Sequence, residues 1–200
     1  MARLKAFDPD EALERAMELF WRDGYDATSL SALLEAMGIS RQSLYDTFGD
    51  KRSLYLATLD LYAGGFAELL QRHLGSPDAG VVALFAFGQS YLATFIHDED
   101  RATCMMAAAA LGIANRDDAV AAKVKAHVSA FEAALLTTIV NAKRAGEVDA
   151  AVDPTAAARL LVTVFSGLSV MHRSGASRTA LRRTIEAAVG ALTRVPSVDA

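Results

Sequence analysis

The sequence predicts an all-α protein of about nine helices, and three observations support this prediction. Apolar residues recur at three- and four-residue spacings through most of the 200 residues, which is the period of one buried helix face. No stretch of strict apolar–polar alternation indicates a β-strand. Asp8-Pro9 and Asp153-Pro154 each combine a capping carboxylate with a proline suited to the first helical position.

The predicted helices follow one another with short turns between them. Gly24 and Gly146 each follow a helical stretch, where a glycine commonly ends a helix. The segment from Ser76 to Gly80 contains Pro77 and predicts a loop. The helices are predicted at residues 8–23, 29–37, 41–48, 51–74, 80–97, 101–114, 118–145, 154–173 and 177–194.

Composition excludes several classes of protein. The hydrophobic fraction of 52% is too high for a disordered chain and is sufficient for a buried core. The longest apolar run, Cys104 to Ala114, is shorter than the ~20 residues that a membrane-spanning helix needs. The first residues show no apolar signal segment, and a single cysteine excludes an intrachain disulfide. We therefore expect a soluble cytoplasmic protein with no membrane partner.

The clearest functional pattern lies in residues 28–52, where two short helices are joined by Gly38-Ile39-Ser40. Leu44 and Phe48 are four residues apart and are expected to hold the second helix against the core. The opposite face carries polar side chains: Arg41, Gln42, Ser43, Tyr45 and Asp46. This arrangement is typical of a helix-turn-helix, whose second helix enters the major groove of DNA. A solvated helical hairpin without a partner is the alternative that periodicity leaves open.

The residue types on this helix pair suit contact with DNA. Gln42 can bond adenine in two places, and Arg41 can reach guanine or phosphate. Lys51 begins the next helix, where its charge adds to free backbone N–H groups that attract phosphate. Thr28 is expected to cap the first helix of the pair, and Ser40 the second. The predicted DNA-binding residues are Thr28, Ser40, Arg41, Gln42, Ser43, Tyr45 and Lys51.

An ordered series of short stretches extends this pattern: AMELF at 16–20, GYDATSL at 24–30, MGISRQSLY at 37–45 and FGDKRSL at 48–54. Through this series, residues 10–59 resemble the N-terminal domain of TetR-family transcriptional repressors. The resemblance implies phosphate contacts from Thr28, Tyr45 and Lys51 and base contacts from Arg41, Gln42 and Ser43. It implies a DNA-binding domain at 1–50, a ligand-binding and dimerisation domain at 51–200, and a homodimer on a palindromic operator of double-stranded DNA.

Two positions depart from the family pattern. Thr47 stands where the family usually has His or Tyr, so a phosphate contact expected there is weaker or missing. Asp46 lies on the groove-facing side, where DNA phosphates repel a carboxylate. It can accept from a cytosine amino group, or turn toward Arg41 or another basic residue and only shape the surface. Residues 1–55 hold seven basic and ten acidic side chains, so non-specific DNA affinity should be modest.

The resemblance also implies that the last two long helices pair across a two-fold axis. Residues 154–173 and 185–192 mix large apolar side chains with Ala, Ser and Gly, which lets helices approach closely. Packing within one chain is the alternative. The predicted dimerisation residues are Leu161, Val164, Phe165, Leu168, Ala188 and Leu192.

A small-molecule effector that releases the repressor is a further expectation from the resemblance. Aromatic and sulfur-containing residues of the central helices suit an apolar or amphipathic ligand, whose identity the sequence does not give. Ordinary core packing is the alternative. The predicted lining residues are Phe66, Tyr91, Phe95, Cys104, Met105, His127 and Phe131.

Cys104 has an additional interpretation. A thiol at a helix N-terminus near Arg101 would be favoured as a thiolate, which makes redox or electrophile sensing an alternative to a small buried core residue. The sequence shows no nucleophile elbow, no glycine-rich phosphate loop and no metal-ligand spacing. We therefore expect no enzyme activity, cofactor or metal. A helical small-molecule-binding protein or enzyme without a DNA role is the remaining alternative.

Overall fold

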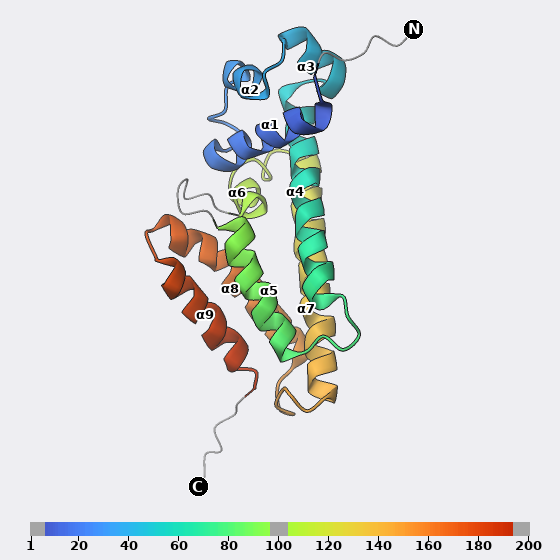
Figure 1. The fold of residues 1–200 in the computed structure, drawn as a ribbon, viewed down its shortest axis with the longest axis vertical. Helices are drawn as coiled ribbons and strands as arrows, with labels where there is room; N and C mark the ends of the chain where they lie inside the picture. The colour runs from blue at the N-terminus through green and yellow to red at the C-terminus, as the bar shows by residue number, and fades with distance from the viewer. Residues whose placement is uncertain (1–6, 97–103, 194–200) are drawn as a thin grey trace. The chain divides into compact units, whose positions relative to one another are not determined.

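The computed structural model describes residues 7–96 and 104–193, and within these ranges it contains nine α-helices and no strand (Figure 1). The all-α prediction is confirmed. The helices are α1 (Pro9–Asp23), α2 (Leu30–Met37), α3 (Arg41–Phe48), α4 (Lys51–Leu74), α5 (Val81–Phe95), α6 (Met105–Leu111), α7 (Asp118–Arg144), α8 (Pro154–Arg173) and α9 (Arg178–Gly190).

The helix starts largely follow the predicted capping. The Asp8 carboxylate accepts a hydrogen bond from the Asp10 N–H at 2.9 Å, and Asp153 does the same for Thr155 at 2.9 Å. The cap of α2 differs from the prediction, because Ser29 and not Thr28 accepts from the Ala32 N–H. The Thr28 hydroxyl instead donates to the Gly24 carbonyl in the preceding turn.

Three helices are shorter than predicted by more than one residue. The predicted helix 101–114 corresponds to α6, which ends at Leu111, just before Gly112, and residues 101–103 lie outside the described ranges. The predicted helix 80–97 becomes α5, which ends at Phe95. The predicted helix 177–194 becomes α9, which ends at Gly190. Apolar periodicity marks the buried face of a helix but not the residue at which its hydrogen bonds stop.

The described chain packs as two compact units. Unit 1 consists of the described parts of Met1–Gly65 and Met105–Val124, and unit 2 of those of Phe66–Cys104 and Lys125–Ala200. Helices α4 and α7 contribute residues to both units. These units are divisions by packing, so the functional boundary at residue 50 stays a prediction.

The core of unit 1 fixes the helix-turn-helix. Helices α1 and α2 pack against each other. Phe20, Leu33, Leu44 and Leu54, from α1 to α4, are each at most 2% exposed. Burying these side chains supplies the hydrophobic stabilisation that holds the short helices in place.

Unit 2 contains α5, α8 and α9 and most of α7, and α9 packs against both α5 and α8 (Figure 1). One stripe of α8 is buried and includes Leu161, Phe165 and Leu168, whereas another is exposed and apolar. By length and composition alone α8 could also span a membrane, with 33% of its apolar window buried; the core helix of a soluble protein passes the same test.

Candidate nucleic-acid interface and effector site

The turn between α2 and α3 is tightly held. Gly38 adopts the left-handed conformation, with φ of 66°, and its N–H bonds the last turn of α2. Ser40 begins the next helix, where its hydroxyl accepts from the Ser43 N–H at 3.1 Å. Glycine suits position 38 because a residue with a side chain would be strained in this left-handed conformation. These contacts fix α3 relative to α2 within unit 1.

Helix α3 places its polar side chains in solvent. Leu44 is fully buried and holds the helix to the core, as predicted, while Phe48 is half-buried. Arg41, Gln42 and Tyr45 are exposed, with Tyr45 at 47%. A helix anchored by one face and polar on the other is the geometry that base recognition in the major groove requires.

The two serines of this helix also serve its N-terminus. The hydroxyls of Ser40 and Ser43 are 2.9 Å apart and share a hydrogen bond. Ser40 is exposed and Ser43 is half-buried. Only one of the two hydroxyls keeps a free proton to donate to phosphate, because the shared hydrogen bond uses the proton of the other.

The structure places Thr28 inside unit 1. Its side chain is 1% exposed, and its hydroxyl donates to the Gly24 carbonyl at 2.6 Å. We expected this hydroxyl to reach a phosphate. In this structure it instead closes the turn between α1 and α2, because its proton is used there and water cannot reach it.

Lys51 lies at the first residue of α4, as predicted, and has a partner that the sequence analysis missed. Its ammonium group is 4.4 Å from the ring centroid of Tyr25. Tyr25 is itself in contact with Tyr55 at 4.9 Å and with Phe20 at 6.1 Å between ring centroids. Partial burial lowers the pKa of Lys51, and the negative charge of Asp26 opposes that shift. The ring therefore holds the ammonium group at the start of α4.

Ion pairs connect the start of α7 to the helix-turn-helix within unit 1. Arg52 makes two hydrogen bonds to Asp117, at 2.6 and 2.9 Å, and lowers the pKa of that carboxyl. Asp117 also accepts from the Val120 N–H, which caps α7. Arg116 pairs with Asp26 in the turn after α1. No local sequence pattern indicates these pairs, because their partners are 65 and 90 residues apart.

Five of the seven predicted effector-lining residues meet in one aromatic cluster in unit 2. Phe66 is the centre, with ring centroids 4.4 Å from His127, 5.0 Å from Phe131 and 5.6 Å from Phe95. Tyr91 joins at 6.3 Å. Phe87 and Phe165 complete the cluster, each 5.5 Å from Phe131.

Two polar groups of this cluster have altered acidity. Burial lowers the pKa of His127 to about 4, so the imidazole is neutral at pH 7. Burial also raises the pKa of the Tyr91 hydroxyl, and the nearby Cys104 adds to the rise. Cys104 is buried, and its N–H donates to the Ser169 hydroxyl at 2.9 Å. Met105 is 1% exposed and belongs to unit 1.

Comparison with known proteins establishes the family. Residues 12–58 match the family described as "Bacterial regulatory proteins, tetR family". Residues 80–188, more than half of the chain, match the "Tetracyclin repressor-like, C-terminal domain". The chain belongs to the TetR family. It is a DNA-binding transcriptional regulator with a helix-turn-helix.

Relatives of similar length support this assignment. The HTH-type transcriptional repressor ComR of Escherichia coli is 32% identical over 88% of this chain and 84% of its own. The HTH-type transcriptional regulator YezE of Bacillus subtilis is 32% identical over 74% of this chain and 77% of its own. A solved structure of a cysteine mutant of the TetR-family regulator CifR, complexed with 26-base-pair operator DNA, is 33% identical. It covers 94% of this chain and 99% of its own, with a TM-score of 0.82.

Four of the residues that the TetR-family resemblance led us to expect at a dimer interface are buried within the single chain. Leu161, Phe165, Leu168 and Leu192 are each at most 4% exposed within the single chain. Phe165 belongs to the aromatic cluster. These four side chains therefore belong to the core of the single chain. Helix periodicity could not show this for α8, because it does not distinguish the two apolar stripes of that helix. Val164 and Ala188 are half-buried.

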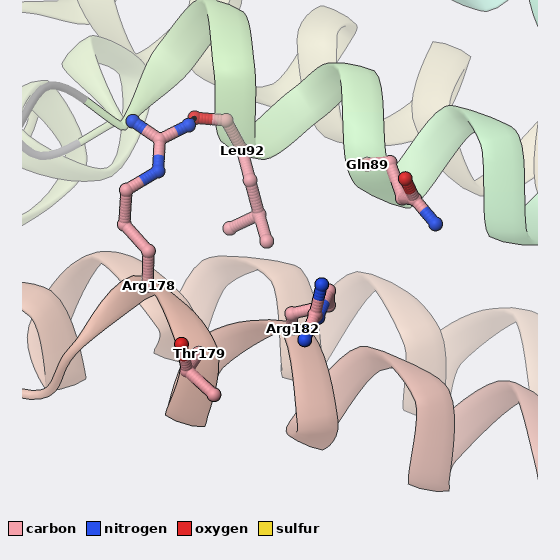
Figure 2. Close-up of a pocket in the computed structure, with 5 residues that line it drawn as sticks. All are labelled: Gln89, Leu92, Arg178, Thr179 and Arg182. Carbon is pink, nitrogen blue, oxygen red and sulfur yellow. Dashed lines mark hydrogen bonds between the residues drawn. The ribbon is translucent and has the colours of Figure 1, made fainter.

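Two of the cavities in the described part of unit 2 are notable because no residue of the aromatic cluster lines them. One has a volume of about 180 Å³ and is lined by polar side chains of α5 and α9 (Figure 2). There the Arg178 guanidinium donates to the backbone oxygens of Leu92 and Ile96 at 2.9 and 3.0 Å, and so caps the end of α5. The other, of about 510 Å³, lies along α4 and α7 beside Leu70 and Leu74. Neither holds a predicted effector-lining residue.

Proposed function

We propose that this TetR-family regulator is a homodimeric repressor that binds a palindromic operator through α3. A small apolar or amphipathic effector would release it. The observation that carries the proposal is the exposure of Arg41, Gln42 and Tyr45 on a helix anchored by fully buried Leu44. Such a repressor acts in the cytoplasm, where bacterial DNA lies.

The chemistry of each side chain suggests its role. Arg41, Gln42 and Ser43 would read base edges, because guanidinium, amide and hydroxyl groups match the major-groove donors and acceptors. Tyr45, Lys51 and Ser40 would contact phosphates and set the position of α3. Support for a repressor comes from ComR, which is named one, and from CifR, whose structure contains operator DNA.

The exposed stripe of α8 supports a dimer. Leu160, Val170 and Met171 are 49%, 57% and 54% exposed. They lie on one side of α8 together with Thr163 and Gly167, so this side presents exposed apolar side chains near both of its ends. We propose this stripe, with Val164 and the facing side of α9 around Ala188, as the interface, in place of the four buried residues.

The aromatic cluster is the proposed effector site. Its rings are in mutual contact, so an effector can enter only by separating them. The effector would therefore bind a conformation with separated rings more tightly than the conformation with packed rings. A ligand shifts a repressor away from DNA only if it has such a preference for the conformation that does not bind DNA. The neutral His127 and the Tyr91 hydroxyl would supply the polar contacts. Met105 and Cys104 stay predictions as lining residues.

Selection from a random DNA library tests the DNA-binding proposal. The purified protein should enrich a two-fold symmetric site, and footprinting should show protection of both halves. Arg41→Ala should lower affinity for that site. Lys125→Ala, which removes an exposed charge of α7, is the matched control and should bind like wild type. Enrichment of no site by the wild-type protein would overturn the proposal.

Light scattering tests the proposed interface. Wild type should have twice the chain mass of 21.3 kDa, and the double variant Leu160→Glu, Val170→Glu should be monomeric. Val82→Glu is the control, because Val82 is 80% exposed on α5, outside the stripe. A double variant that remains dimeric would place the interface elsewhere.

Release assays separate the effector proposal from the thiol alternative. Compounds that dissociate the operator complex should act less well on Phe131→Leu, whose operator affinity stays unchanged. Oxidants should have little effect on wild type, and Cys104→Ser should keep the response to compounds. If Cys104→Ser loses every response while still binding the operator, thiol sensing is the correct mechanism.

A further inference from the structure

The recognition helix contains a side-chain pair that sets the orientation of one predicted base-reading group. The Gln42 Nε2 atom donates to the Asp46 Oδ1 atom at 2.7 Å, one helical turn further along α3. Both side chains are exposed on the face that carries Arg41 and Tyr45. The carboxylate that phosphates would repel therefore has a specific partner on the DNA-facing surface.

The chemistry of this pair allows only one orientation of the amide. An ionised carboxylate only accepts hydrogen bonds, so the nitrogen end of the Gln42 amide must face it. The oxygen end would be repelled by the same charge. A glutamine amide without such a partner can turn by half a rotation and exchange its donor and acceptor ends. We propose that Asp46 is a specificity-determining positioning residue, which holds Gln42 with its Oε1 acceptor directed to the base edge.

A fixed acceptor selects one class of base. In the major groove, adenine and cytosine present amino donors, whereas guanine and thymine present carbonyl acceptors. The Gln42 oxygen therefore favours an amino-bearing base on the contacted strand. Adenine is favoured over cytosine, because the second N–H of the same amide can donate to adenine N7. This inference rests on the proposed function, in which α3 enters the groove.

The Asp46 carboxylate should lower the overall affinity for DNA while it increases the preference for one class of base. Its charge is repelled by the DNA backbone, and this repulsion does not depend on sequence. Removing the charge should therefore raise affinity for all DNA while discrimination between bases falls. An inert surface carboxylate would change affinity alone, so the two roles have different signatures.

The test compares binding preferences of the full-length wild-type protein and variants on a library of operator sequences that differ at each base. In Asp46→Asn the new amide can accept from Gln42 or donate to it, so both orientations become available. Discrimination between amino and carbonyl bases at one position of each half-site should fall about tenfold. Affinity for random-sequence DNA should rise about threefold. Asp46→Ala should give the same loss.

Two further variants isolate the mechanism. Glu35→Gln removes an equal charge from the exposed face of α2 and should leave base preference unchanged. In a Gln42→Ala background, Asp46→Asn should change random-DNA affinity but not base preference. A remaining effect on preference there would mean that Asp46 reads a base directly, and unchanged preference in the single variant would mean that it positions nothing; either overturns the inference. If wild type selects no site at all, the proposed function fails and this inference with it.

Discussion

The apolar pattern of helix α3 indicates which of its faces is free to bind a partner, whereas the apolar pattern of helix α8 does not. In α3 one apolar residue, Leu44, is buried, and the polar side chains around it are exposed. In α8 apolar side chains cover two stripes, one inside the core and one in solvent. A polar helix face must contact either solvent or a polar partner, because it cannot pack in an apolar core. An apolar face can belong to a core, a partner or a ligand.

This difference extends to the two units. Unit 1 anchors its helices with a hydrophobic core and fixes its functional surface further with caps, a glycine turn and ion pairs. Unit 2 holds its candidate effector site with aromatic rings packed on one another. Substitutions should therefore affect DNA contacts in unit 1 with little loss of stability, and stability in unit 2 with little direct effect on DNA contacts.

The largest effect should come from Phe131→Ala. Phe131 is 5% exposed and touches Phe66, Phe87 and Phe165, so its removal leaves a cavity among the rings. The free energy of unfolding in urea should fall by about 3–5 kcal/mol. Val128→Ala, one turn earlier and 39% exposed, should cost less than about 1 kcal/mol. Equal losses would mean that the rings are not a packed core.

The next effect is a pH dependence from His127. Its pKa is about 4 when folded and near 6.5 when unfolded, so below pH 6.5 the unfolded chain binds a proton that the folded chain does not. The His127 contribution to stability should be complete above pH 6.5 and fall as the pH drops toward 4, by about 3 kcal/mol. In His127→Gln this part of the loss should be absent, so the difference between the wild-type and variant curves should change as the pH falls below 6.5. Parallel curves for wild type and variant would contradict the burial of the imidazole.

A smaller effect concerns binding to DNA. Lys51→Ala should weaken binding to all sequences by about tenfold and reduce the salt dependence by about one phosphate contact. Chemical unfolding should show near-normal stability, because Lys51 is only partly buried. If only the selected operator is bound more weakly, Lys51 reads sequence and not phosphate.

The smallest effect should come from Tyr25. Tyr25→Leu should weaken DNA binding by about two- to fivefold, because the Lys51 ammonium loses its aromatic support. Tyr25→Phe keeps the ring and should bind like wild type. In Lys51→Ala, Tyr25→Leu should have no additional effect on DNA affinity. An equal effect with and without Lys51 would show that Tyr25 acts through the packing with Tyr55 and not through the lysine.

The sequence predicted the parts of the molecule that depend on neighbours along the chain. The bounds of α3 and α4, the capping by Asp8 and Asp153, and the exposed face with Arg41 and Gln42 all follow from residues within one or two turns. Asp46 was expected to face a cytosine amino group or to turn toward Arg41 or another basic residue, whereas in the structure it accepts from Gln42, four residues earlier on the same helix.

What the sequence missed depends on contacts between distant segments. The pair of Arg52 with Asp117 and the ring of Tyr25 under Lys51 join residues that no local pattern relates. The assignment of Phe165 to a dimer interface had the same cause, since only the packed structure shows which stripe of α8 the core covers. Aromatic residues at helical spacing indicated the cluster, but not that its rings would already be in contact.

The most direct test of the central claim is a footprint of the operator, selected from a random DNA library, with wild type and with Gln42→Ala. Wild type should protect a two-fold symmetric site, and Gln42→Ala should bind it about five- to hundredfold more weakly and lose its preference at one position in each half. That result would establish α3 as the reading element of a dimer. Unchanged affinity and preference in Gln42→Ala, or protection without symmetry, would contradict it.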